Sequence, residues 1–317
     1  MSNARARVSR LAPSPTGLLH LGHARTFLFT WWHAKKTGCS LALRIEDLDG
    51  PRVQPEFVSA ALRDLEWLGL DWDGSPSLQS HGLERLNAAV ERLLAEGRAY
   101  PCVCTRGDLR QAQSAPQQGD SEPRYPGTCR GRYASLEEAR NKSGREPGVR
   151  LLVAEGTVTV HDELGGDFSG DVAAEVGDFL IARRGGLPAY QLAVVADDDA
   201  QGVTDIVRGD DLLPSTLRQW HVRRALSLGD PLYFHVPLVV DESGRRLAKR
   251  ELDLSLFELR ERGADPRAIV AWAAASAGLR VPPRVSAAEV LPSFDWALLP
   301  REPLPLSEAF VRALCEA

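Results

Sequence analysis

The stretch that decides the fold of this chain reads Arg10-Leu-Ala-Pro-Ser-Pro-Thr-Gly-Leu-Leu-His-Leu-Gly-His-Ala-Arg-Thr26. It follows a short apolar run, turns on Pro13, Pro15 and Gly17, and then enters an amphipathic segment. That order predicts a strand, a loop and a helix. A helix N-terminus after such a loop offers backbone N–H groups and the positive end of the helix dipole, which suits a phosphate group.

Two histidines, His20 and His23, stand three residues apart, so both can face one side of the first helical turn. Gly22 lets a ligand approach the backbone between them. Two imidazoles at a helix N-terminus can stabilise a phosphoryl transition state. An isolated His-x-x-His is more often part of a surface helix, but the preceding loop favours a phosphate site.

The composition is that of an ordinary globular protein. The chain has 317 residues, a formal net charge of -5, 44% hydrophobic residues and 26% charged residues. This charge argues against a protein that coats nucleic acid, although it leaves room for a local basic surface. No apolar run approaches membrane-spanning length, and the N-terminus lacks the apolar core of a signal peptide. We therefore expect a cytoplasmic monomer that binds no membrane.

Strands and helices alternate in the first hundred residues, which favours a parallel sheet with crossover helices. After an insertion at about 101–188, the sheet is expected to resume with a buried strand, and the tail to be mostly helical. The strands expected are Val8–Ala12, Leu41–Leu48, Val149–Val153, Thr157–His161 and Tyr190–Ala196, with the fourth and third antiparallel. The helices expected are Ala24–Lys36, Pro55–Leu70, His81–Gly97, Ser215–Leu228 and Asp265–Leu279.

Three of the five cysteines, Cys102, Cys104 and Cys129, fall in the expected insertion. An odd number of cysteines in a cytoplasmic chain argues against a disulfide framework. Clustered thiolates are soft ligands suited to zinc, while three reduced cysteines in a loop-rich segment are the alternative. Cys39 and Cys315 are interpreted as ordinary thiols.

Several motifs in order resemble class I aminoacyl-tRNA synthetases of the glutamyl branch. They are the loop quoted above, the strand Arg44-Ile-Glu-Asp47, the segment Ile206-Val-Arg-Gly-Asp-Asp211 and the basic turn Arg245–Arg250. The resemblance covers residues 8 to about 250. It is closer to the truncated paralogues of glutamyl-tRNA synthetase, the glutamyl-queuosine tRNA(Asp) synthetases, because only about 65 residues follow Lys249, fewer than an independent anticodon-binding domain needs.

The resemblance implies a Rossmann-type α/β catalytic domain in two halves, 1–100 and 189–250, the second with a KMSKS-like loop. An inserted, acceptor-type subdomain with a zinc site would occupy 101–188, and a helical, stem-contact-like region 251–317. It also implies that ATP and Mg²⁺ activate L-glutamate without tRNA. The glutamate would then pass to the queuosine base in the anticodon loop of tRNA(Asp).

The resemblance also implies a glutamate pocket. Guanidinium groups can clamp the carboxylates of glutamate, and an acidic side chain can hold its ammonium group. Which arginine takes which carboxylate stays open. For two of the pocket residues, an ion pair within the protein is the alternative to binding glutamate: Glu46 could pair with Arg44, and Arg208 with Asp205 or Asp210. The implied pocket residues are Arg10, Ala12, Ser14, Glu46, Tyr190 and Arg208.

The ATP site implied by the family consists of His20, Gly22, His23 and Lys249, with the two histidines and the lysine catalytic. The loop here reads Arg246-Leu-Ala-Lys-Arg250, so an arginine replaces the first lysine of the family motif and Ala248 removes a hydroxyl. A solvated basic turn is the alternative. The implied ligands of a structural zinc ion are Cys102, Cys104, Tyr125 and Cys129.

Three other functions stay open: a glutamyl-tRNA synthetase that charges tRNA(Glu) without an anticodon-binding domain, a small-molecule nucleotidyltransferase, and a catalytically silent RNA-binding protein. Asp197–Asp199 is interpreted as a solvated helix start, and Gln111–Pro126 as mobile. RNA contacts are expected from scattered arginines, namely Arg124, Arg130, Arg132, Arg218, Arg223 and Arg224.

Overall fold

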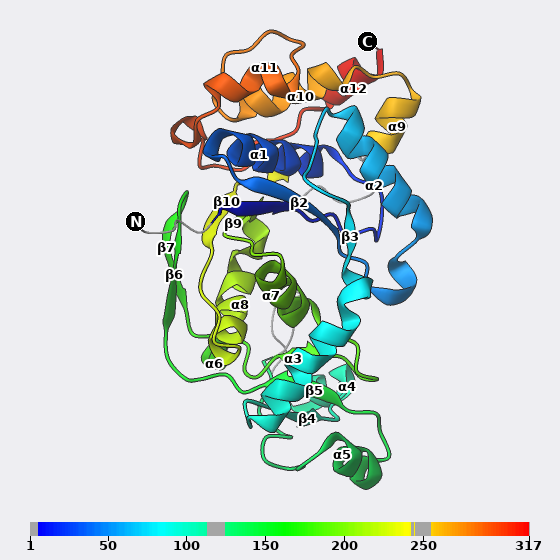
Figure 1. The fold of residues 1–317 in the computed structure, drawn as a ribbon, viewed down its shortest axis with the longest axis vertical. Coiled ribbons are helices and arrows are strands. Elements are labelled where there is room, and N and C mark those ends of the chain that lie inside the picture. The colour runs from blue at the N-terminus through cyan, green and yellow to red at the C-terminus, as the bar shows by residue number, and fades with distance from the viewer. Residues whose placement is uncertain (1–5, 113–123, 242–243, 245–254, 317) are drawn as a thin grey trace.

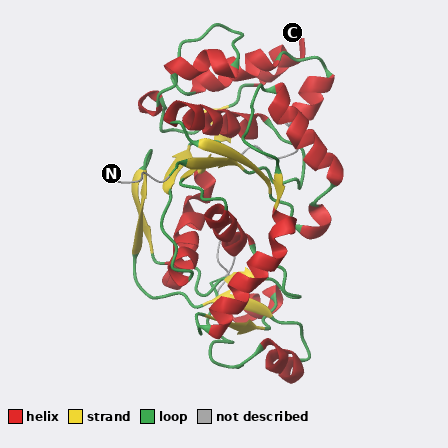
Figure 2. Ribbon diagram, viewed as in Figure 1, coloured by secondary structure: helices red, strands yellow, loops and turns green. Residues whose placement is uncertain are grey.

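A twisted sheet crosses the middle of the molecule and carries helices on both faces (Figures 1 and 2). The computed structural model describes residues 6–112, 124–241, 244 and 255–316. Among these residues, none of the helices combines the length and the apolar character that a bilayer crossing requires. The predicted α/β class is confirmed.

The central sheet consists of two halves that meet at β1 and β9. One half has the order β1-β2-β3 and is parallel; the other has the order β7-β6-β10-β9, in which β7 runs antiparallel to β6. At the seam, Thr204 N donates a hydrogen bond to Val8 O at 2.9 Å. The strands are β1 (Val8–Leu11), β2 (Ser40–Ile45), β3 (Ser77–Leu78), β6 (Val158–Asp162), β7 (Gly166–Gly170), β9 (Asp205–Gly209) and β10 (Leu232–Val236).

This seam is a topological switch point, because the chain leaves β1 toward β2 on one side and enters β9 and β10 on the other. In open α/β sheets, ligands bind beyond the carboxyl ends of the strands at such a point. The strand order therefore directs attention to the residues that follow β1 and β9.

Helix α1 (Leu21–Thr37) covers one face of the sheet, and the C-terminal helices pack on it (Figure 1). Arg25 Nε donates to Ser276 Oγ at 2.8 Å, and Trp32 Nε1 donates to Ala287 O at 2.9 Å. The tail thus belongs to the same core as the sheet. The other elements of this layer are α2 (Pro55–Trp67), α9 (Leu256–Glu261), α10 (Pro266–Ser276), α11 (Ala287–Val290), α12 (Glu308–Glu316) and the short strands β11 (Val239–Val240) and β12 (Leu304–Pro305).

The opposite face is covered by α7 (Tyr190–Ala200) and α8 (Leu213–Ala225), and α3 (Leu83–Ala95) packs against α7. The prediction of a strand at Tyr190–Ala196 is therefore wrong. The run is apolar except for Gln191 because the helix packs against α3, α8 and β8. A short, buried helix shows the same apolar run as a buried strand. The prediction of a solvated helix start at Asp197–Asp199 is wrong as well, since Asp197 and Asp198 are buried near the end of α7.

The segment between the two halves of the sheet carries a small antiparallel sheet in the order β4-β5-β8, at the end of the molecule far from the C-terminus (Figure 1). Its hairpin β6–β7 reaches back and pairs with β10. The predicted strands at Val149–Val153 and Thr157–His161 correspond to β5 and β6. They do not pair with each other: β5 is antiparallel to β4 and β8, and β6 is antiparallel to β7. The remaining elements are β4 (Ala99–Cys102), β5 (Gly148–Leu151), β8 (Leu180–Ala182), α4 (Arg106–Ala112), α5 (Leu136–Ser143) and α6 (Val172–Glu175).

Asp205, at the start of β9, ties the two halves of the sheet to α1. Its carboxylate is fully buried and accepts hydrogen bonds from His33 Nε2 at 3.0 Å, from Thr204 Oγ1 at 2.5 Å and from Arg7. We expect Asp205→Asn to lower the free energy of unfolding by about 3 kcal/mol, because it breaks a buried charge network. Urea denaturation measures this, with the exposed Asp199→Asn as control, expected to change it by less than about 0.5 kcal/mol.

Because of the same contacts, the contribution of Asp205 to the free energy of unfolding depends on pH. Burial alone would raise the pKa of Asp205, but the hydrogen bonds from His33 and Arg7 outweigh it and lower the pKa. Stability from a lowered carboxyl pKa is present above the ordinary aspartate value of about 3.9 and is lost as pH falls below it. The difference between wild type and Asp205→Asn should therefore be constant near neutral pH and shrink below about pH 4. A difference that grows toward acid would contradict this assignment.

Candidate active site

One cavity of about 570 Å³ lies at the carboxyl ends of β1 and β9 and at the N-terminus of α1. Its walls bring together residues that are far apart in the sequence. Lys249, Arg246 and Ala248 lie outside the described residues, as does most of Gln111–Pro126. The predicted site residues that line the cavity are Arg10, Ala12, Ser14, His20, Gly22, His23, Glu46, Tyr190 and Arg208.

The two histidines cap helix α1 with their Nδ1 atoms. His20 is the N-cap residue, and its Nδ1 accepts a hydrogen bond from Gly22 N at 3.1 Å. His23 Nδ1 accepts from His20 N at 3.2 Å, and the two rings stack with centroids 3.7 Å apart. Because Nδ1 is the acceptor, a neutral ring carries its proton on Nε2. Each imidazole can therefore cap the helix and also present an N–H donor.

Gly22 keeps this arrangement compact. A Cβ atom at this position would lie 3.0 Å from Cε1 and 3.1 Å from Nδ1 of the His20 ring, so a side chain would crowd the histidine. Next to it, Leu256 N donates to Leu19 O at 2.7 Å, and Ser255 pairs with His20 in an antiparallel bridge. The chain that follows Lys249 thus joins the structure beside His20.

Arg10 and Glu46 form the polar wall at the carboxyl ends of β1 and β2. Arg10 is buried, and its Nη1 donates to Val207 O at 3.3 Å. Glu46 Oε1 accepts from Arg44 Nη2 at 3.0 Å, which is the ion pair expected as an alternative to ligand binding. Burial raises the pKa of Glu46, while Arg44 and Arg10 oppose this rise. The pair occupies one carboxylate oxygen of Glu46, and Glu46 also lines the cavity.

Arg208 is held in place by neutral partners. Its Nε donates to His235 Nε2 at 3.1 Å, its Nη1 to Gln219 Oε1 at 2.9 Å and its Nη2 to Thr216 Oγ1 at 2.8 Å. His235 Nδ1 lies 2.7 Å from Asp162 Oδ2, and burial lowers the pKa of this histidine. The ion pair of Arg208 with Asp205 or Asp210, considered as an alternative to ligand binding, is not among the contacts of the described residues. Its positive charge is oriented but not neutralised by these partners.

Two further pocket residues have simpler roles. Ser14 Oγ donates to Glu46 O at 3.4 Å and fastens the loop to the end of β2. Tyr190, the first residue of α7, lines the cavity and is 37% exposed.

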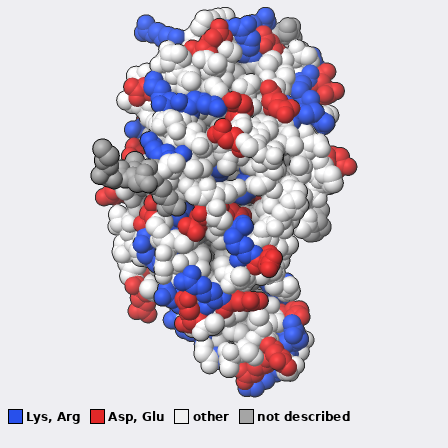
Figure 3. Space-filling model, in the orientation of Figure 1, with Lys and Arg blue, Asp and Glu red and all other residues white. Residues whose placement is uncertain are grey.

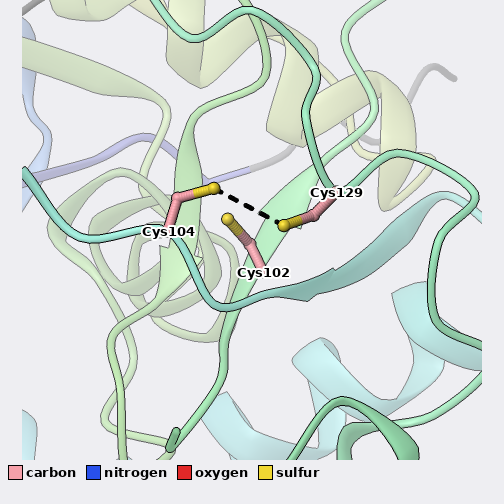
Figure 4. A group of neighbouring side chains, drawn as sticks. All are labelled: Cys102, Cys104 and Cys129. Carbon is pink, nitrogen blue, oxygen red and sulfur yellow. Dashed lines mark hydrogen bonds between the residues drawn. The ribbon is translucent and has the colours of Figure 1, made fainter. Parts of the chain in front are cut away.

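The three cysteines form a compact cluster at the base of the small antiparallel sheet (Figure 4). The sulfur atoms of Cys102, Cys104 and Cys129 lie within 4.8 Å of one another, and those of Cys104 and Cys129 are 3.5 Å apart. Tyr125 Oη is 3.5 Å from Cys102 Sγ. These spacings fit four donors around one tetrahedral zinc ion with Zn–S bonds of about 2.3 Å.

The neighbours of the cluster favour a thiolate at Cys102. A hydrogen bond from Cys129 and the nearby guanidinium of Arg150 lower the pKa of Cys102. Arg150 Nε donates to Cys102 Sγ at 3.2 Å, and its guanidinium lies 3.7 Å from the centre of the Tyr125 ring. The donor set and its surroundings therefore fit a cation-binding site.

The arginines expected to contact RNA differ in their burial and in their partners. Arg223 is buried and donates to Gly229 O, so its expected RNA contact is wrong. Arg130 is half-exposed and pairs with Asp178, and Arg224 pairs with Asp230. On the face shown in Figure 3, basic and acidic groups are interspersed. Charge on this face alone does not define where RNA would bind.

Several residues around the site were missed by sequence reasoning. His235 and Asp162 come from β10 and β6, and Asp198 from α7 was set aside as solvated. The only signal for Asp198 was its position directly after an apolar run, which argues for burial once the run is understood as a helix that continues to Ala200. His235 and Asp162 become neighbours of Arg208 only through strand pairing.

Comparisons with known proteins agree with this geometry. Residues 7–281 match the family of class I tRNA synthetases (E and Q), catalytic domain. The chain is 42% identical over 315 residues to a glutamyl-Q tRNA(Asp) synthetase of Symbiobacterium thermophilum, with 96% of this chain and 97% of the relative covered. It is 45% identical over 300 residues to a glutamyl-Q tRNA(Asp) synthetase of Nocardia farcinica, with 94% and 93% covered.

A solved structure shares the fold. The crystal structure of a glutamate tRNA ligase from Elizabethkingia meningosepticum in complex with its amino acid matches with a TM-score of 0.82. The match covers 98% of this chain and 68% of that chain at 24% identity. At this identity the likeness establishes the class I synthetase catalytic fold and nothing finer.

Proposed function

Because the chain belongs to the glutamyl-Q tRNA(Asp) synthetase family of class I tRNA synthetases, we propose that it activates L-glutamate with ATP and transfers it to queuosine in tRNA(Asp). Activation forms glutamyl-adenylate and pyrophosphate without tRNA. The observation that carries this proposal is the cavity at the switch point, whose lining includes Arg10 and Arg208, Glu46, and His20 and His23.

The charges at one end of the cavity suit glutamate. Three guanidinium groups, those of Arg10, Arg44 and Arg208, lie near two carboxylates, those of Glu46 and Asp198. The excess of one positive charge matches a ligand with two carboxylates and one ammonium group. Glu46 then holds the ammonium through the oxygen that Arg44 does not occupy, and the arginines hold the carboxylates. Glutamine, which carries no net charge, would leave the excess uncompensated.

The other end of the cavity suits the phosphates of ATP. The N-terminus of α1 supplies a positive dipole end. His20 and His23 would donate from Nε2 to the α-phosphate, where charge develops as the glutamate carboxylate attacks and pyrophosphate leaves. Lys249 would add a positive charge to the phosphates, and Mg²⁺ would accompany ATP.

Pyrophosphate exchange tests the activation step. The purified chain, ATP, Mg²⁺ and labelled pyrophosphate should give labelled ATP when glutamate is added and tRNA is absent. Glutamine in place of glutamate should give none. A catalytically silent RNA-binding protein would give no exchange under any condition. Exchange that appears only with tRNA(Glu) would instead indicate a glutamyl-tRNA synthetase and would overturn the proposed tRNA-independent activation.

We also propose that Cys102, Cys104, Cys129 and Tyr125 hold a structural zinc ion. Sulfur ligands and a tetrahedral spacing favour zinc over harder metals. The support is the convergence of the three sulfur atoms and the phenol oxygen within one cluster.

Metal analysis of the purified chain tests this site. We expect about one zinc ion per chain, because a structural site with four protein ligands holds one ion. Cys129→Ser should lose the metal and lower the melting temperature, whereas Cys39→Ser, which removes a buried thiol outside the cluster, should keep it. Wild-type protein that is folded and active with no bound metal would contradict the proposal.

A further inference from the structure

Asp198 is a buried carboxylate behind the wall of the cavity. It lies near the end of α7, is 2% exposed and does not line the cavity itself. Burying a carboxylate is costly unless it is paired and hydrogen-bonded. Its partners therefore indicate what the charge does in this position.

One oxygen of Asp198 joins two guanidinium groups. Asp198 Oδ1 lies 2.8 Å from Arg44 Nη1 and 3.3 Å from Arg10 Nε. Burial opposes ionisation of Asp198, but Arg44 and Arg10 outweigh it and lower the pKa of this carboxyl. Without this oxygen, two buried like charges would face each other, since each of the two arginines is almost fully buried.

The two arginines link Asp198 to the end of the cavity that would bind glutamate. Arg10 lines the cavity directly. Arg44 reaches it through Glu46, because Arg44 Nη2 donates to Glu46 Oε1 at 3.0 Å while Arg44 Nη1 also donates to Gln201 Oε1 at 2.7 Å. Asp198 thus contacts Arg10 directly, which would hold a carboxylate of the substrate. It reaches Glu46, which would hold the ammonium group, through Arg44.

We propose that Asp198 is the positioning residue of the glutamate site, which holds the Arg10 guanidinium in place and, through Arg44, orients the Glu46 carboxylate. The inference rests on the proposed function of the cavity. Asp198 touches no substrate in this arrangement. It keeps two positive charges and one negative charge at fixed positions, so that the substrate does not have to reorganise them on binding.

The neighbouring Asp197 supplies a matched control. It is equally buried, but its carboxylate accepts from Gln79 Nε2 at 2.6 Å and pairs with Arg85. These contacts join α7 to the segment around α3, and the charge of Asp197 acts on Arg44 more weakly than that of Asp198. Asp199, one residue further, is exposed. The three consecutive aspartates therefore have different expected roles: Asp198 positions the glutamate site, Asp197 contributes to stability, and Asp199 does neither.

The experiment measures pyrophosphate exchange of the full chain against glutamate and ATP concentrations for Asp198→Asn, Asp197→Asn and Asp199→Asn. Asp198→Asn should raise the KM for glutamate about 30-fold, as expected for the loss of a charged hydrogen bond. Its KM for ATP should stay within about 3-fold, because the histidine end is unchanged. Asp197→Asn should lower the melting temperature with the KM for glutamate within about 3-fold, and Asp199→Asn should change neither.

Gln201→Ala is the second, milder variant if Asp198→Asn does not fold. It removes the other acceptor of Arg44 Nη1 and should raise the KM for glutamate several-fold, with the KM for ATP unchanged. A folded Asp198→Asn or Gln201→Ala protein with wild-type KM for glutamate would overturn the inference, as would an equal rise in Asp197→Asn. Wild-type protein with no glutamate-dependent exchange would instead overturn the proposed function, and this inference with it.

Discussion

His20→Ser is expected to lower the kcat of glutamate activation about 10²–10³-fold, the usual cost of removing one donor that stabilises transition-state charge. His20 has two proposed roles: its Nδ1 caps α1, and the N–H of its neutral ring, on Nε2, would donate to the phosphate. Serine is among the best N-cap residues, so its hydroxyl can replace the cap but is too short to reach a phosphate held by the imidazole.

The design separates catalysis from stability. His20→Ser should keep the melting temperature of the wild type, whereas His20→Ala should lose the same activity and, in addition, about 0.5–2 kcal/mol of stability with the cap. The matched control is His161→Ser, which removes an exposed histidine of the β6–β7 hairpin and should leave kcat unchanged. Single-turnover formation of the adenylate is the measurement. An active His20→Ser enzyme would show that the imidazole acts only as a cap.

Arg208→Gln is expected to lower kcat/KM for glutamate about 10²–10³-fold, because it removes a buried charge that the ligand would otherwise pair with. Arg208 is oriented by His235, Gln219 and Thr216, none of which carries an opposing charge. Glutamine at this position can keep some of these hydrogen bonds but cannot neutralise a carboxylate.

The controls for Arg208→Gln test where the effect arises. The KM for ATP should stay within about 3-fold, since the histidine end lies on α1 rather than β9. Arg224→Gln removes a half-exposed arginine of α8 that pairs with Asp230, and should leave glutamate kinetics unchanged. Wild-type kcat/KM in Arg208→Gln would remove this residue from the glutamate site.

The parts of the site that follow local sequence signals were predictable. Pro13, Pro15 and Gly17 end β1 and lead into α1, and the structure places the helix start at Leu21, three residues before the predicted Ala24. The difference has a physical cause. His20 occupies the N-cap position, and histidine is not among the usual capping residues that mark a helix start in a sequence.

The parts that depend on tertiary packing were not predictable. The run Tyr190–Ala196 is apolar except for Gln191, and its packing against α8, α3 and β8 determines that it is a helix. The helical conformation of this run also determines which of the following aspartates are buried. Asp198 could therefore not be linked to Arg10 or Arg44 before the helix was in place, since the three residues come from separate elements.

The central claim is that activated glutamate passes to queuosine rather than to the 3′ end of a tRNA. Incorporation of labelled glutamate is measured into tRNA(Asp) with queuosine, tRNA(Asp) without it, and tRNA(Glu), each with and without its 3′-terminal adenosine. The predicted result is incorporation only into queuosine-containing tRNA(Asp), unchanged by loss of the terminal adenosine. Equal incorporation into both forms of tRNA(Asp), or incorporation only into intact tRNA(Glu), would contradict it.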